Sequence, residues 1–241
     1  MNDDLIPRNV EIHHDHRNVS GGWLRPVVFG AMDGLVSNAA LMAGVAGGGA
    51  TRSTIILAGL AGLAAGAFSM AAGEYVSVKS QAESALAEIE SERLELLHRP
   101  EAELDELIES YVSRGVPRPL ATDFATAISA DFEVALDIHT RDEIGINPND
   151  LPSAWVAASS SFGSFAVGAI IPLLPYLLGL TSNVLALSQI LAVVALFACG
   201  AAVSRVTTRS WWYSGLRQAS IGVAAGLLTY FLGSLVGSGI G

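Results

Sequence analysis

Five long apolar stretches constrain this chain more than any other feature of its sequence. They cover approximately residues 26–49, 54–76, 153–178, 183–204 and 215–237. A helix needs about 20 residues to cross the roughly 30 Å of hydrocarbon in a bilayer, and each stretch is that long. Apolar residues make up 51% of the chain and charged residues only 15%, and the apolar residues run in blocks. We therefore expect an all-α integral membrane protein with five transmembrane helices.

The acidic residues gather between the second and third stretches. Residues 77–150, called the insert below, hold 17 of the 23 Asp and Glu residues, and no acid follows residue 150. A membrane protein with a polar, acidic domain between spans 2 and 3 explains this partition. The predicted regions are an N-terminal tail (1–24), spans 1–2 (25–76), the insert (77–150) and spans 3–5 (151–241).

The insert is expected to form three helices. The first continues span 2 to about residue 97. Pro100 suits the first turn of a second helix, about 101–114. A Gly-Val-Pro turn then leads into a third helix, about 118–144, which Gly145 ends.

The basic residues predict the orientation. Twelve of the 13 lie before span 1, in the insert or between spans 4 and 5, and Arg52 alone lies on the other side. Positive charge is retained in the cytoplasm, so the N-terminus and the insert are expected in the cytosol. The compact loops favour a bacterial inner membrane.

Asp33 is the first candidate for function within the membrane. It lies about 12 Å into span 1, where an ionisable side chain is costly and by default suggests a function. On span 2, Met70 and Glu74 are four residues apart and share one helix face. A carboxylate with a thioether favours iron, manganese or cobalt over magnesium and calcium.

The insert carries a second set of candidate metal ligands. Its acids recur at helical spacing, where like charges repel unless protons or a cation intervene. A solvated acidic face explains the same spacing, and both readings stay open on the residues alone. The candidates are Glu92, Glu95, Glu103, Glu106, His139 and Glu143. The tail residues His13, His14 and His16 could also chelate a metal.

Three segments resemble signatures of the vacuolar iron transporter family, which includes the yeast calcium-cross-complementer-type and nodulin-like transporters. They are DGLVSN at 33–38, GAFSMAAGEYVSV at 66–78 and GAIIPLLP at 168–175. The resemblance extends from about residue 22 to 237. It implies five spans, a homodimer with the path between its protomers, and a cytosolic metal-binding domain between spans 2 and 3.

The resemblance also implies a function, the exchange of cytosolic Fe²⁺, and often Mn²⁺, for protons. Asp33 and Met70 match the metal site within the membrane, and Glu74 matches the acid of the span 2 signature. The five insert glutamates match those of the cytosolic domain. His139 stands where the plant-type pattern has methionine, and since imidazole binds Fe²⁺, Mn²⁺, Co²⁺ or Zn²⁺, the preferred cation stays open.

The sequence thus predicts a proton-coupled metal antiporter and not an enzyme. Its expected partners are the bilayer, divalent metal ions, protons and a second copy of the chain, with no nucleic acid. The metal is substrate, and no prosthetic group is expected. The alternative is a membrane-anchored metal sensor or buffer, which would need the acidic insert but not Asp33.

Overall fold

The computed structural model describes residues 23–148, 150–205 and 209–240, and within these ranges all regular structure is helical. Residues 1–22 of the predicted tail, with His13, His14 and His16, lie outside the described residues. Within the described residues, five helices are long and apolar enough to cross a membrane: α1 (Leu24–Gly47), the first half of α2 (Arg52–His98), α6 to α7 (Ala154–Leu177), α8 (Val184–Val203) and α9 (Trp211–Ile240). The prediction of an all-α protein with five candidate spans is confirmed.

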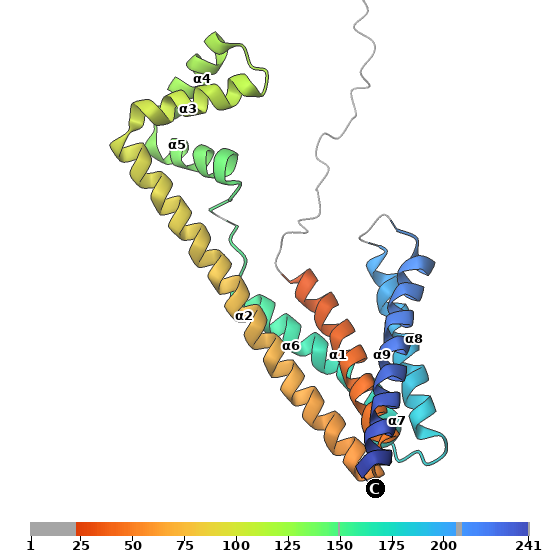
Figure 1. Ribbon diagram of the computed structural model, residues 1–241. Coiled ribbons are helices and arrows are strands. Elements are labelled where there is room, and N and C mark those ends of the chain that lie inside the picture. The colour runs from red at the N-terminus through yellow and green to blue at the C-terminus, as the bar shows by residue number, and fades with distance from the viewer. Residues whose placement is uncertain (1–22, 149, 206–208, 241) are drawn as a thin grey trace, which may run out of the picture.

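Helix α1 is the centre of the membrane bundle and contacts α2, α6, α8 and α9. Glycines let α1 and α6 approach closely: a Cβ on Gly34 would lie 2.3 Å from the carbonyl oxygen of Phe165, and one on Gly168 would lie 2.3 Å from that of Ala31. Helix α6 lies between α1 and α2 (Figure 1). Helix α2 is largely exposed in the single chain, where only 17% of its spanning window is buried.

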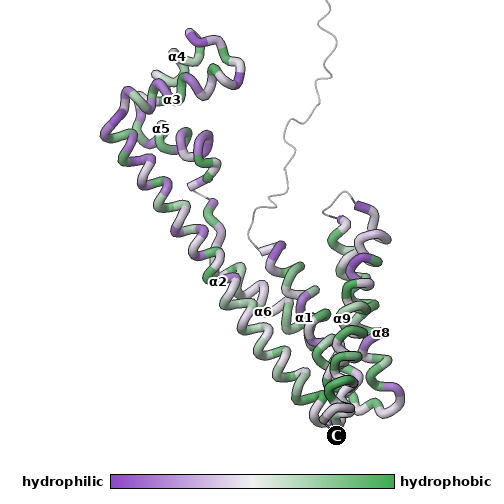
Figure 2. Tube along the Cα trace, in the orientation of Figure 1, coloured by the Kyte–Doolittle hydropathy of each residue, from purple (hydrophilic) through white to green (hydrophobic). Residues whose placement is uncertain are grey.

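Helix α2 continues without a break from the bundle into the insert (Figure 1), as predicted. No proline lies between Arg52 and His98, and the segment beyond Tyr75 is rich in Ala, Glu and Leu, which favour helix. The colours change along α2 from apolar to polar as it leaves the bundle (Figure 2). The boundary expected at residue 76 therefore falls inside one continuous helix.

Three further helices and a π-helical turn complete the insert: α3 (Pro100–Ser113), α4 (Arg118–Ser129), α5 (Phe132–His139) and η1 (Thr140–Ile144). The single helix predicted over 118–144 is wrong. Asp131 has extended backbone, and its side chain accepts hydrogen bonds from the amides of Glu133 and Val134 at 3.0 and 3.3 Å. It therefore caps a new helix instead of continuing the old one.

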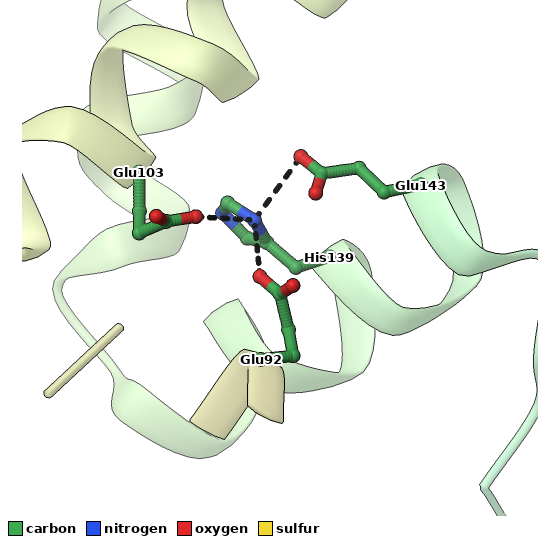
Figure 3. Close-up of side chains that lie close together, drawn as sticks. All are labelled: Glu92, Glu103, His139 and Glu143. Carbon is green, nitrogen blue, oxygen red and sulfur yellow. Dashed lines mark ion pairs between the residues drawn. The ribbon is translucent and has the colours of Figure 1, made fainter. Parts of the chain in front are cut away.

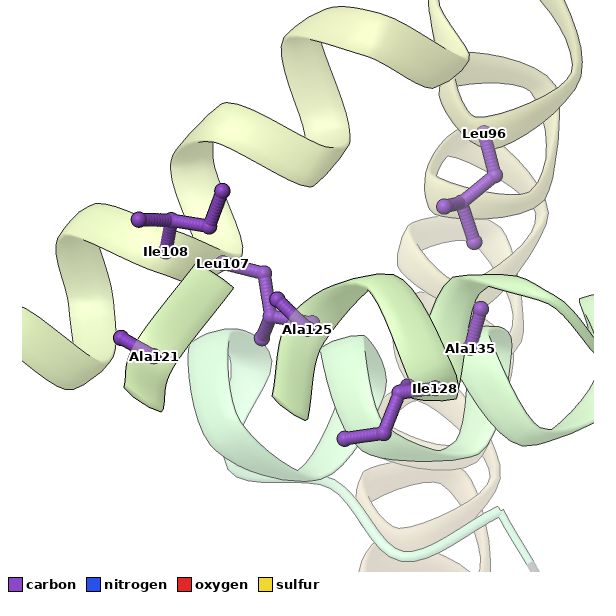
Figure 4. Packing of buried hydrophobic residues seen from close by; sticks show 7 residues of the cluster. All are labelled: Leu96, Leu107, Ile108, Ala121, Ala125, Ile128 and Ala135. Carbon is purple, nitrogen blue, oxygen red and sulfur yellow. The ribbon is translucent and has the colours of Figure 1, made fainter. Parts of the chain in front are cut away.

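The insert has its own hydrophobic core (Figure 4). Leu107 from α3 packs there beside the small residue Ala125 of α4, and Leu96 from α2 lies on the side of Ala135 of α5. Truncating a buried leucine such as Leu107 to alanine typically costs about 2–5 kcal/mol. The seven buried members are Leu96, Leu107, Ile108, Ala121, Ala125, Ile128 and Ala135.

The third span is interrupted where Pro172 and Pro175 lie. Helix α6 (Ala154–Ile170) gives way to a 3₁₀ turn, η2 (Ile171–Leu173), and a short α7 (Leu174–Leu177). A proline ring removes an amide donor, and the carbonyls of Gly168 and Ile171, which would bond the missing donors in an α-helix, accept instead from the amides of Ile171 and Leu174. Ser188 of α8 donates to the carbonyl of Pro172 at 2.6 Å, so the break is stabilised by a neighbouring helix.

Tryptophans mark one end of the bundle. Trp23 precedes α1, Trp155 lies in the first turn of α6, and Trp211 and Trp212 begin α9; all four side chains are about half to three-quarters exposed. Trp155 contacts Tyr75 of α2 with ring centroids 4.8 Å apart. Because Trp and Tyr concentrate at membrane–water interfaces, this arrangement indicates that the bilayer surface crosses α2 near Tyr75.

Candidate metal-binding sites

Four ligand-type side chains meet in the insert, each from a different element. Glu92 comes from α2, Glu103 from α3, His139 from the end of α5 and Glu143 from η1 (Figure 3). One donor atom from each lies within 4.8 Å of all the others. We call these four residues the insert cluster.

The imidazole of His139 is the centre of the insert cluster. Its Nδ1 lies 3.0 Å from Glu92 Oε1, 3.3 Å from Glu143 Oε1 and 3.8 Å from Glu103 Oε2. His139 is fully buried, and Glu92 and Glu103 are nearly so. Neither ring nitrogen of His139 nor Glu92 Oε1 has a hydrogen bond of good geometry within the described part of the chain.

The local fold brings these donors together. The π-helical turn η1 widens the helix directly after His139, and such turns are frequent at functional sites. Gly145 then ends the turn with a left-handed φ of 71°, which a residue without a side chain adopts most easily. Glu143 consequently reaches the same nitrogen that faces Glu92 and Glu103.

Burial and mutual repulsion change the acidity of the insert cluster. Burial, followed by the charge of Glu143, raises the pKa of Glu92 to about 7. Burial, followed by the charges of Glu106, Glu103 and Glu95, raises the pKa of Glu143 to about 7. Burial, followed by the charge of Glu106, also raises the pKa of Glu103. Three carboxylates this close favour a proton or a cation among them.

The insert cluster has the chemistry of a transition-metal site. One imidazole nitrogen with carboxylate oxygens suits Fe²⁺, Mn²⁺, Co²⁺ or Zn²⁺. Donors about 2.0–2.2 Å from a shared ion are separated by roughly 3–4.4 Å, so a spread of 4.8 Å needs only a small contraction. The predicted ligands Glu95 and Glu106 are exposed and lie outside the cluster, although their charges act on it.

The membrane candidates line two adjoining cavities instead of forming a cluster. The first, of about 240 Å³, is lined by Asp33 and Met70 with Ser37, Asn38 and Ser69 among its other walls. The second, of about 280 Å³, is lined by Glu74, Met70 and Ser69 with Phe29, Gly73 and Ser77. Ser69 and Met70 belong to both, so the cavities meet there.

Sequence reasoning missed Asn38, whose side chain is buried in the wall of the first cavity. Its amide nitrogen donates to the carbonyl of Ala169 on α6 at 2.6 Å. A carboxamide five residues after Asp33 in an apolar span was the available signal, since polar side chains within membranes are often functional.

A multi-pass membrane protein thus emerges, with polar cavities between its helices and a histidine–carboxylate cluster outside the bundle. Comparison with known proteins defines the family. The VIT family pattern matches residues 24–234, and the chain belongs to this family.

Named relatives extend over most of the chain. Vacuolar iron transporter 1 of Oryza sativa subsp. japonica is 31% identical over 93% of this chain and 90% of its own length, and that of Arabidopsis thaliana is 30% identical over the same shares. The Vacuolar iron transporter of Acanthamoeba castellanii is 41% identical over 66% of this chain and 58% of its own length.

Proposed function

We propose that this protein is a proton-coupled exporter of divalent transition metal, with Fe²⁺ as the main substrate and Mn²⁺ as a second. The observation that carries the proposal is the pair of adjoining cavities along α1 and α2, which place Asp33, Met70 and Glu74 along one polar route in an otherwise apolar bundle. The relatives named as iron transporters support the choice of metal.

Capture takes place at the insert cluster. Its carboxylates must lose their protons to ligate a metal, so binding displaces protons held by Glu92 and Glu143. Glu95 and Glu106 add negative charge around the cluster and serve as further ligands or as an electrostatic funnel. The insert therefore raises the concentration of cations next to the mouth of the path.

Passage follows the cavities from Glu74 to Asp33. Glu74 is buried just inside the level of Tyr75, where α2 enters the bilayer. Met70 lines both cavities and supplies a soft, weak ligand between the two acids. A second copy of the chain is proposed to pack against the exposed face of α2 and to close the path, in a homodimer with a two-fold axis.

Proton coupling rests on Asp33. An ionised Asp33 attracts the cation, and a protonated Asp33 releases it, because proton and metal compete for the same oxygens. Protonation on the far side and deprotonation on the cytosolic side then exchange metal for protons. No covalent chemistry is needed, in keeping with a transporter and not an enzyme.

The proposed orientation places the insert in the cytosol, by the distribution of basic residues. The start of α1, the insert, the end of α8 and the start of α9 lie toward one side of the bundle (Figure 1). The bacterial inner membrane stays a prediction. The relatives compared are named vacuolar, and in either membrane the metal would leave the cytosol.

The test is Fe²⁺ flux into proteoliposomes under an imposed pH gradient. We expect flux in the intact chain that needs the gradient and vanishes in Asp33→Ala, with partial loss in Glu103→Ala/Glu106→Ala. The matched control is Ser220→Ala on α9, an exposed residue that lines neither cavity and whose hydroxyl donates to the backbone carbonyl of Arg217. An intact chain that binds iron through the insert but moves none under any gradient would replace the transporter with the metal sensor or buffer.

A further inference from the structure

The side chain of Asn38 has one satisfied end and one unsatisfied end. Its Nδ2 donates to the carbonyl of Ala169, and since a carbonyl only accepts, the amide nitrogen must lie on that side. Oδ1 therefore faces away from α6. It is buried and has no hydrogen bond to any residue that the structure describes. Buried oxygens without a partner are uncommon, and each calls for an explanation.

The surroundings of Oδ1 point to a ligand. Asn38 is 2% exposed and lines the 240 Å³ cavity together with Asp33, Ser69 and Met70. Across from it on α2 is Gly62, where a Cβ would lie 3.0 Å from Oδ1. The glycine thus leaves space next to this oxygen, in a cavity that already holds a carboxylate and a thioether.

We infer that Oδ1 of Asn38 is a further ligand of the divalent cation in this cavity, beside Asp33 and Met70. An amide oxygen is a hard, neutral donor that suits Fe²⁺ and Mn²⁺. It coordinates the ion without adding a second negative charge, so the ion remains free to leave when Asp33 takes a proton. The same carboxamide connects the bound ion to Ala169, one residue before the end of α6 and the break in the third span.

The inference rests on the proposed function only in placing the cavity on the metal path, and metal binding tests it without transport. The background is the full chain in detergent with the insert cluster silenced by Glu92→Gln/Glu103→Gln/Glu143→Gln. Equilibrium dialysis with Co²⁺ then measures binding in the membrane part, and Asp33→Asn in this background serves as the positive control.

Two substitutions separate the ligand role from the contact with Ala169. Asn38→Leu removes both the oxygen and the amide donor, whereas Asn38→Asp keeps an oxygen and loses the donor. We expect Asn38→Leu to weaken Co²⁺ binding about tenfold or more, as for loss of a contact to a charged group. Asn38→Asp should bind Co²⁺ at least as tightly as Asn38 does. A merely structural contact would weaken binding equally in both variants, and that result would overturn the inference.

Gly62→Ala gives an independent reading should Asn38→Leu fail to fold. Its methyl group would crowd Oδ1 and the flexible side chain of Leu41 while leaving the bond to Ala169 in place. It should weaken Co²⁺ binding as well, and unchanged binding counts against the inference. If the intact chain moves no metal but binds Co²⁺ in an Asn38-dependent way, the proposed transport fails and the inference stands. If the intact chain transports Fe²⁺ and Asn38→Leu leaves the KM for Fe²⁺ unchanged, the proposed transport stands and the inference about Asn38 fails.

Discussion

The insert cluster and the membrane cavity use metal-binding side chains in opposite ways. The insert cluster brings three carboxylates and an imidazole within 4.8 Å of one another. Its negative charges repel one another unless a proton or a cation lies among them. Among the described residues that line the 240 Å³ cavity, Asp33 alone is acidic, and its companions are a thioether, hydroxyls and an amide. Under the proposed function, this difference fits a capture site that accumulates negative charge and a passage site that carries little charge, from which the ion can leave.

The largest effect is expected from Asp33→Asn, which removes the single charge of the cavity and preserves the shape of the side chain. Fe²⁺ flux in proteoliposomes should fall roughly a hundredfold, since a charged contact is lost outright. Dialysis should find the metal capacity of the insert unchanged. Substantial remaining flux would mean that the cavity does not depend on its carboxylate, and the contrast drawn above would fail.

The second effect concerns capture. Glu92→Gln/Glu143→Gln should weaken Co²⁺ or Mn²⁺ binding by the insert by some tens of times, because two of its oxygens lose their charge. Flux should show a raised KM while the maximal rate stays within about twofold, as for loss of uniform binding. Glu88→Gln, on an exposed side chain of the same helix, is the control. A lost maximal rate at saturating metal would show that the insert takes part in passage itself.

The third effect is a pH dependence of capture. The raised pKa values of Glu92 and Glu143, both about 7, mean that these acids hold protons below that pH in the metal-free fold. Metal affinity of the insert should therefore be highest above pH 7 and fall by about tenfold per pH unit for each proton displaced below it. Dialysis of the intact protein at pH 5.5, 6.5 and 7.5 measures this slope. Affinity that is flat from pH 5.5 to 7.5 would contradict the assignment of these acids as ligands.

The smallest effect is expected from His139→Met, which introduces the methionine of the plant-type pattern at this position. Imidazole favours Zn²⁺ and Co²⁺ more than a thioether does, so binding of these ions should weaken several-fold while Mn²⁺, held mainly by carboxylates, changes least. Competition dialysis among the three ions gives the order directly. Equal losses for all three would indicate that the substitution disturbs the buried fold around His139 and not metal preference.

Much of the fold was predictable because it depends on local signals. Length and hydropathy predicted the five spans, and the helix-forming residues from Val76 to about Leu97 predicted that span 2 would continue into the insert. The break at Asp131 was missed because the same residue type is tolerated within an exposed helix, and only the adopted backbone reveals a cap.

The candidate site was also predictable only in part. Helical spacing and family resemblance identified Glu92, Glu103, His139 and Glu143, which the fold brings together. The exposure of Glu95 and Glu106 could not be read from spacing, because it depends on how α3 and α5 pack on α2. The polar character of Asn38 within a span could be read from the sequence, but its contact with Ala169 could not, because the two residues lie 131 positions apart.

The unbroken helix α2 fixes both the distance and the relative rotation between the insert cluster and Glu74. Glu74 and Glu92 lie 18 residues apart, which at 3.6 residues per turn is five whole turns and about 27 Å along the axis. The two acids therefore share one rotational phase and face the same side of a single rod. Inserting one residue near Leu86 would shift the insert cluster by only about 1.5 Å but would turn it by about 100° away from the path. The spacing between the two sites can thus vary only in steps close to a whole number of turns.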